Sequence, residues 1–419
     1  MILDKDGNVY VHQPKLQELN ISNIHEKYFE EDNGGVNINN YKQEWVNWGS
    51  NNLKPQKLLY FSNNSPILKG IQNKEITRIT GDEIVYEDTN EPIGTEYPFY
   101  KTSEFVTLED FINSLSSDLS KLSTFSFSVE YQRNAEKVAN MYYMPSTSIR
   151  SGKKMNDGVV QNYFISTHWE KMNSIDRNNY QPKEVKSWNS KKAGNAQLYY
   201  FKTKNQLDHF YADVSWESSL NYAILDYEIS NFHLANIRNG LSPGLIISFP
   251  QSYSPEFKQK MSAEFNKKRG PQGTGSKMIL NGTGTSDSLP TITQLGVSDL
   301  DKQFNLLNTT LNEKISLSTG IPRILAGLDT NIGLSNGKDV LIGAESEWFK
   351  NEISTKRKYI IDAINEINDF NGYRRIAIKD KLPTLLSFVS EARISQAISD
   401  EMILNELGIK MKPKTDGEN

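Results

Sequence analysis

Residues 299–327 read DLDKQFNLLNTTLNEKISLSTGIPRILAG, a long helical pattern that ends in a sharp turn. Ser298 and Asp301 form the capping pattern that commonly begins a helix, and Gly320 with Pro322 marks its end. The opposite faces of this helix differ: one is rich in Lys, Asn, Thr and Ser, and the other carries apolar residues at helical spacing, namely Leu300, Phe304, Leu307, Leu311 and Ile315. We therefore expect an amphipathic helix over 299–319.

A second long helix is expected upstream, over residues 216–239, which contain neither Gly nor Pro. Gly240 stands where the C-terminal cap of this helix belongs. Its apolar residues mark two faces, the first through Leu220, Ala223, Ile224, Tyr227, Leu234 and Ala235, and the second through Tyr222, Leu225, Ile229 and Phe232. A helix that is apolar on two faces is packed on both.

Between these helices, residues 240–298 show a compact strand–helix–strand pattern. The apolar run 245–249 predicts a strand, residues 254–268 predict a helix, and residues 278–280 predict a second strand. Glycine-rich loops lie at 270–275 and 282–284.

After the turn at Pro322, small polar residues and glycines predict a loop over 321–337. A helix of about 30 residues then follows over 338–369, with a length of roughly 45–50 Å at 1.5 Å per residue. A strand is expected over 373–378. We expect a further helix over 384–407 and a polar tail after it.

The first 215 residues predict one α+β domain. Residues 1–60 look irregular and polar. The pattern Ser65-Pro66 at one end and Gly81 at the other predicts a helix, and the Thr107-x-x-Asp110 pattern predicts the start of a second one. Alternating apolar and polar residues predict strands over 125–131, 141–144, 197–202 and 210–214, with a turn at 133–136.

The composition is that of a globular chain with a polar surface. The chain has 419 residues, long enough for about three domains. With 47 basic and 51 acidic residues its net charge is −4, which excludes a strongly basic protein that coats nucleic acid. Because cysteine is absent, disulfides, a thiolate nucleophile and Cys-ligated zinc are excluded.

The sequence predicts no membrane segment and no secretion signal. Charged residues occupy the N-terminus where a signal peptide needs an apolar run, and no apolar run approaches the ~20 residues of a membrane span. We therefore expect a protein that is assembled in a reducing cytoplasm.

Patterns for catalysis are missing from the sequence. The five histidines are not spaced as metal ligands, and neither a His-Glu-x-x-His motif nor a Gly-x-Ser-x-Gly motif occurs. The glycine-rich stretches 270–277 and 333–339 lack the Gly-Lys-Ser/Thr order of a phosphate-binding loop. We expect no catalytic, cofactor or metal-binding residues and no enzyme; nucleotide or nucleic-acid binding through these loops is the alternative.

Basic residues cluster between the two long helices. Over 241–297, six basic residues face three acidic ones: Lys258, Lys260, Lys267, Lys268, Arg269 and Lys277 against Glu256, Glu264 and Asp287. This cluster is either a solvated surface or a contact with nucleic acid or an acidic partner, and the sequence leaves both interpretations open.

The order of these elements resembles the portal proteins of tailed bacteriophages, of the HK97-like family. Residues 232–250, FHLANIRNGLSPGLIISFP, are similar to the helix end, Asn-Gly turn and clip strand of that family, and residues 275–282, GSKMILNG, to its second clip strand. Residues 299–327 resemble its stem helix and Gly-Ile/Val-Pro turn. Residues 45–52, WVNWGSNN, with Pro55 and the Ser65-Pro66-Ile67 segment, are similar to its N-terminal Trp-Gly…Asn…Pro entry and the helix that follows. Residues 140–210 carry no part of the resemblance.

The resemblance implies a non-enzymatic ring, usually of twelve copies, at one vertex of a virion capsid. Double-stranded DNA passes through the ring during packaging and ejection, and the large terminase and a head–tail adaptor dock on it. Further implied partners are the major capsid and scaffold proteins, with assembly in the host cytoplasm and no membrane or cofactor.

The resemblance also implies a division of the chain. Residues 1–215 and 339–383 correspond to the wing and tunnel helix, 216–239 and 299–319 to the stem, 240–298 to the clip, 320–338 to the tunnel loop, and 384–419 to a short crown-like helix and tail. The implied site residues fall into three groups. Stem packing involves Tyr222, Leu225, Ile229, Phe232, Phe304, Leu307 and Leu311; contacts of the clip with partners or DNA involve Lys267, Lys268, Arg269 and Lys277; the tunnel loop includes Ile321, Arg323, Leu328, Asp329, Asn331, Ser335, Asn336 and Lys338.

Overall fold

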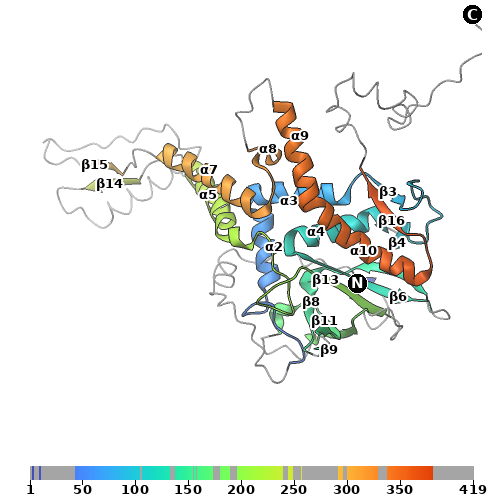
Figure 1. Ribbon diagram of the computed structural model, residues 1–419. Coiled ribbons are helices and arrows are strands. Elements are labelled where there is room, and N and C mark those ends of the chain that lie inside the picture. Colours follow the sequence, from blue (N-terminus) through green and yellow to red (C-terminus); the bar gives the residue numbers. More distant parts are fainter. Residues whose placement is uncertain are drawn as a thin grey trace, which may run out of the picture.

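The computed structural model of the chain describes residues 2–3, 9–10, 43–103, 106–132, 137–153, 155–156, 158–172, 180–188, 196–238, 244–248, 256, 291–295, 300–328 and 337–380. It is a mixed helix and sheet structure with a body from which one pair of helices projects (Figure 1).

Two consecutive helices, α2 (Lys54–Asn64) and α3 (Pro66–Thr80), lie at the start of the body. The predicted signals of α3 are confirmed: the Ser65 hydroxyl accepts a hydrogen bond from the Leu68 amide at 3.2 Å, and Gly81 ends the helix with a φ of 71°. The expectation that residues 1–60 are irregular is wrong for α2, which begins after Leu53 without a side-chain cap and so lacks the usual sequence signal.

Helix α4 (Leu108–Leu122) begins with the predicted capping box. The Thr107 hydroxyl accepts from the Asp110 amide, and the Asp110 carboxylate accepts from the Thr107 amide. The chain then turns at Ser123, whose φ of 54° is left-handed, and continues directly into strand β6 (Thr124–Tyr131).

Strand β6 is the centre of an antiparallel sheet in the order β13–β6–β7, with β7 at Val138–Tyr143 and β13 at Ala196–Lys202. The strands predicted over 125–131, 141–144 and 197–202 are thereby confirmed, whereas the turn predicted at 133–136 lies outside the described residues. Aromatic pairs cross the strands: Phe127 stacks on Tyr199 and Phe125 on Phe201, both at 4.8 Å between ring centroids.

A second antiparallel sheet has the order β12–β11–β8, with β8 at Ile149–Ser151, β11 at Asn162–Ile165 and β12 at Lys183–Lys186. It adjoins the first sheet where the Trp188 amide donates to the Leu198 carbonyl at 2.8 Å. No strand forms over 210–214, contrary to the prediction, because the Asn205 and Asp208 side chains accept hydrogen bonds from the following amides and hold this segment in turns.

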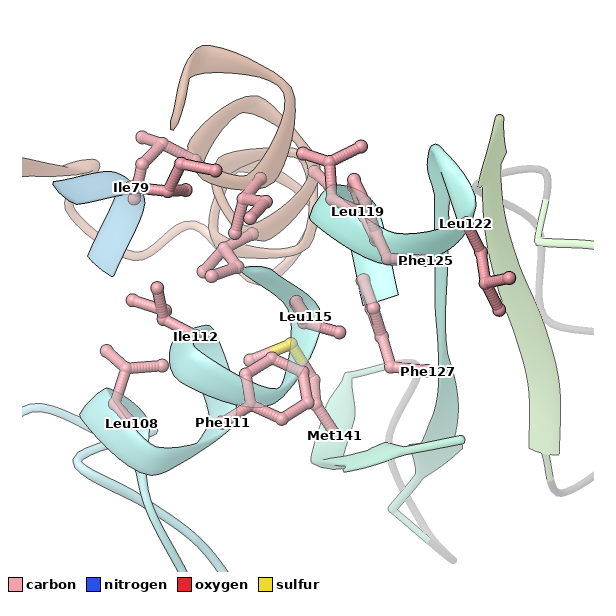
Figure 2. Packing of buried hydrophobic residues seen from close by; sticks show 14 of the residues in the cluster. Ile79, Leu108, Phe111, Ile112, Leu115, Leu119, Leu122, Phe125, Phe127 and Met141 are labelled. Atoms are coloured by element: carbon pink, nitrogen blue, oxygen red, sulfur yellow. The ribbon is translucent and has the colours of Figure 1, made fainter. Parts of the chain in front are cut away.

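The main hydrophobic core lies around α4. Figure 2 shows Phe111 and Leu115 of α4 facing Phe127 and Met141 of the first sheet, and Ile112 on the side of Ile79. All these side chains except Ile79 belong to α4 or to the adjoining sheet, and all are fully buried. Helix α10 (Ser354–Asn371) contributes its apolar face to the same core.

The C-terminal half follows the predicted order. A 3₁₀ turn, η5 (Glu217–Ser219), continues into α5 (Leu220–Arg238); then come β14 (Gly244–Ser248), β15 (Thr291–Leu295) and α7 (Leu300–Thr319). The two predicted long helices and the strand at 245–249 are confirmed. β14 pairs with β15 in antiparallel fashion, whereas the partner strand expected at 278–280 and nearly all of the helix expected over 254–268 lie outside the described residues.

The long C-terminal helix consists of α9 (Gly337–Trp348), a π-helical turn at Phe349–Ile353 and α10. β16 (Ile376–Lys379) then pairs with β3 (Glu83–Tyr86), which confirms a strand within 373–378. The expected helix over 384–407 lies outside the described residues. The remaining short elements are β1 (Ile2–Leu3) with β2 (Val9–Tyr10), β4 (Lys101–Ser103) with β5 (Val106–Thr107), β9 (Met155–Asn156) with β10 (Val159–Val160), and the 3₁₀ turns η2 (Ser146–Ser148) and η3 (Trp169–Lys171).

Candidate functional site: the projecting helix pair

Helices α5 and α7 lie side by side and extend away from the body, with β14 and β15 beyond their far end (Figure 1). The two helices are antiparallel, since α5 leads outward to the paired strands and α7 leads back from them. The pair is therefore joined to the body only near its base, and its outer part extends toward β14 and β15.

The base of α5 is fixed to the body by polar contacts. The Asp226 carboxylate accepts hydrogen bonds from the Ser65 hydroxyl at 2.5 Å and from the Ile67 amide at 3.1 Å, which places a negative charge at the N-terminus of α3. Just before α5, the Trp216 indole donates to the Lys121 carbonyl at 2.8 Å. These contacts set the direction in which the pair leaves the body.

The apolar stripe of α7 packs inward at its base. Leu311 and Ile315 are fully buried, as is Ala223 on the facing part of α5. Leu311, one of the residues expected to take part in stem packing, is covered within its own chain. Leu307 is half-buried, and the side chain of Phe304 lies outside the described residues.

The outer sides of both helices expose large apolar side chains. On α5 the exposed fractions are 41% for Leu225 and 42% for Phe232, and on α7 they are 70% for Leu306 and 78% for Leu317. Tyr222 and Ile229 are half-buried. Leu306 and Leu317 were missed in the sequence because they fall outside the main stripe of α7. Several apolar side chains on one projecting element are typical of an interaction surface.

The turn after α7 is more ordered than the predicted loop. Ile321 is buried, and residues 323–326 form a short helix, α8 (Arg323–Ala326). The Lys74 ammonium of α3 donates to the Leu325 carbonyl at 2.8 Å, and Arg323 pairs with Glu313 at 3.0 Å. The prediction of an irregular loop is therefore wrong for 321–328, because these contacts fix it. Asp329, Asn331, Ser335, Asn336 and the side chain of Lys338 lie outside the described residues.

The tryptophan-rich segment at 45–55 has a structural role. Gly49 and Asn52 adopt left-handed backbone conformations, with φ of 81° and 62°, which wrap the segment around the buried Arg150 guanidinium. The Asn52 side chain and carbonyl accept hydrogen bonds from Arg150, and the Trp169 ring lies 4.8 Å from the guanidinium carbon. Burial lowers the pKa of Arg150 to about 10, so the group stays charged at neutral pH.

The described residues offer no group of His, Asp and Glu that could hold a metal ion. Within the same residues no helix is both long and apolar enough to cross a bilayer. The glycine-rich stretches 270–277 and 333–336 and the basic residues Lys267, Lys268, Arg269 and Lys277 lie outside the described part of the chain. Nucleotide or nucleic-acid binding through those loops therefore stays a prediction.

No family model and no curated protein matches the sequence. Solved structures do match the fold. One is a chain from the virion of a native gene transfer agent particle, at 12% identity and a TM-score of 0.53, which covers 85% of this chain and 94% of that chain. Another is from the neck of the native particle computed with C12 symmetry, at 12% identity and a TM-score of 0.54, covering 85% and 95%.

An HK97 family phage portal protein from Corynebacterium diphtheriae is also among the similar structures, at 9% identity and a TM-score of 0.41, covering 81% of this chain and 98% of that chain. The fold of this chain is thus similar to that of chains from the virion and the neck of a gene transfer agent particle.

Proposed function

We propose that the chain is a portal subunit that forms a closed ring at one vertex of a virion capsid. The ring is the conduit through which double-stranded DNA is packaged and ejected. In this assignment α5 and α7 form the stem, the region with β14 and β15 forms the clip, the turn after α7 leads into the tunnel loop, and the body with α9 and α10 forms the wing and tunnel helix.

The observation that carries this proposal is the exposure of apolar side chains along both outer sides of the projecting pair. Leu306 and Leu317 on α7 and Phe232 on α5 are 42–78% exposed in the single chain. Apolar surface on two different helices suits a head-to-tail interface, in which each subunit offers one surface to the preceding copy and the other to the next. The related neck structure computed with C12 symmetry supports a ring of twelve.

The charge of the proposed channel lining agrees with a conduit. Residues 299–338 carry four basic and four acidic side chains, namely Lys302, Lys314, Arg323 and Lys338 against Asp299, Asp301, Glu313 and Asp329. A strongly basic wall would bind phosphates tightly, whereas a neutral wall allows DNA to slide. We expect the large terminase, a head–tail adaptor and the major capsid and scaffold proteins as partners of the ring, which assembles in the host cytoplasm.

Native mass spectrometry and negative-stain images of the purified chain test the proposal. We expect a closed ring with a central opening, and loss of the ring when Leu306 is changed to Glu, because a charge on the interface opposes burial. Leu207→Glu is the matched control, since Leu207 is 94% exposed on a loop apart from the helix pair. A chain that stays monomeric at every concentration, also with capsid and scaffold proteins present, would contradict the proposal.

A further inference from the structure

We infer that in this ring Phe232 of each subunit contacts Leu306 of the next. The inference rests on the proposed function and deepens it, because it fixes which side chains meet across the interface. It follows from the heights of these residues along the helix pair and from the sides on which they lie.

Phe232 and Leu306 lie at the same height. The outer ends of the two helices are level, because each is joined to the paired strands by a segment of similar length. β14 begins six residues after Arg238, the last residue of α5, and α7 begins five residues after Leu295, the last residue of β15. The strand ends themselves are level because Gly244 pairs directly with Leu295. Phe232 is six residues before the end of α5, and Leu306 is six residues after the start of α7. Since both helices rise about 1.5 Å per residue, each lies about 9 Å from the outer end of its helix.

Counting residues from the outer ends of the two helices also agrees with which residues are buried together at the base of the pair. Ala223 lies 15 residues before the end of α5, and Ile315 lies 15 residues after the start of α7. Both are fully buried in the same core cluster, as expected for residues at one height on two packed helices. Leu317 falls level with Asn221, close to the base of the pair.

The exposed residues point away from the body. Phe232 follows Ala223 by nine residues, about two and a half turns, so it lies on the opposite side of α5 from this buried residue. Leu306 and Leu317 are eleven residues apart, about three turns, and share the side of α7 that turns away from buried Leu311. Each helix therefore offers one outward apolar row.

Cyclic symmetry then determines the pairing. The copies in a closed ring are related by rotation about one axis without a shift along it, so equivalent residues lie at equal heights. When the helix pair runs along that axis, the α5 row of one subunit meets the α7 row of the next at matched heights. Phe232 then faces Leu306.

Disulfide cross-linking tests this pairing, and the absence of cysteine from the chain gives it a clean background. The double variant Phe232→Cys with Leu306→Cys is the matched pair. The control is Phe232→Cys with Leu317→Cys, whose heights differ by about 16 Å, too far for a disulfide that needs Cα atoms about 4.4–6.8 Å apart. We expect oxidation of the intact ring to give a ladder of linked subunits for the matched pair and single chains for the control.

The outcomes separate the pairing from the ring itself. Three results with an intact ring would overturn the pairing while leaving the ring in place. These are links between subunits through the control pair, links of the matched pair within one chain, and no links of the matched pair at all. Failure of the unsubstituted chain to form a ring overturns the proposed function. If the matched variant does not assemble, photo-cross-linking from a benzoylphenylalanine placed at Phe232 is the second test. Linkage to the part of α7 around Leu306 in a neighbouring subunit supports the pairing, and linkage elsewhere or within one chain overturns it.

Discussion

Arg150 is a cation without exposed surface, and its neighbours explain how the fold tolerates it. Its hydrogen bonds go to carbonyl and amide oxygens, including the Thr147 carbonyl at 3.0 Å and the Ile149 carbonyl at 2.7 Å. The rings of Trp48 and Trp169 lie 5.9 and 4.8 Å from the guanidinium carbon. A planar guanidinium satisfies several fixed acceptors at once and stacks on aromatic faces, which an ammonium does not do equally well.

Arg150→Met is therefore expected to destabilise the chain by about 3 kcal/mol or more, because one hydrogen bond to a charged group is worth roughly 1.5–3 kcal/mol and several are lost. Urea unfolding followed by tryptophan fluorescence measures the change. Arg375→Met is the control: this exposed side chain pairs with Glu87 at 3.6 Å, and exposed pairs contribute about 0–1 kcal/mol. Equal losses in both variants would contradict the role assigned to the buried cation.

At the scale of elements, the most informative contact joins α5 to α3. Pro66 has no amide hydrogen, the Ile67 amide donates to Asp226 and the Leu68 amide donates to Ser65. The first turn of α3 is thus satisfied partly by its own cap and partly by a carboxylate from the projecting helix. The orientation of the proposed stem is consequently tied to the start of a core helix.

Asp226→Ala should lower the stability by about 1–2 kcal/mol, the usual cost of losing an N-terminal cap. Hydrogen exchange should also become faster at the Ile67 amide, which loses its acceptor. Thermal unfolding and exchange followed by mass spectrometry measure both effects. Asn221→Ala, an exposed position on the same helix, should change neither; unaltered exchange in Asp226→Ala would show that the contact does not hold the two helices together.

Local patterns explain which elements the sequence could predict. The Thr107–Asp110 capping box and the Ser65 cap lie within a few residues of the helices they begin, so they were visible before the structure. Helix α2 has no side-chain cap, and the π-helical turn at 349–353 lies inside the long predicted helix where neither Gly nor Pro marks it, so the sequence did not single out either feature. Residues 210–214 looked like a strand because the alternation of apolar residues was read without the Asn205 and Asp208 side chains just before it, which accept hydrogen bonds from the following amides and favour turns.

The residues of the candidate site were likewise predicted from the sequence only in part. The two-faced pattern of α5 predicted a second apolar face, on which the single chain leaves Leu225 and Phe232 exposed. Leu306 and Leu317 are isolated apolar residues on the polar side of α7. Single exposed apolar residues are common on protein surfaces, so the sequence alone does not indicate that these two take part in an interface. Their role becomes a hypothesis only when both helices are seen to project together from the body.

At the scale of the whole molecule, assembly into a ring would strengthen the electrostatic attraction exerted by a small positive charge on each subunit. Residues 241–297 carry six basic and three acidic side chains, an excess of three positive charges in a chain whose net charge is −4. In the proposed ring, in which residues 240–298 are assigned to the clip, closed symmetry would repeat this excess in every subunit at one end. Charge gathered in this way attracts an acidic partner or DNA more strongly than one subunit can.

Replacing Lys267, Lys268 and Arg269 together by Ser should therefore leave the ring intact and weaken docking of the terminase or the adaptor. In the unsubstituted ring the binding should fall as salt rises, because exposed charges are screened over about 8–10 Å at physiological ionic strength. Pull-down of both partners at low and high salt measures this. The triple variant Lys183→Ser, Lys186→Ser and Lys204→Ser removes the same charge from exposed positions of the body and should bind normally. Unchanged binding by the 267–269 variant would show that this basic cluster is an ordinary solvated surface, because a docking contact depends on the positive charge of these three side chains.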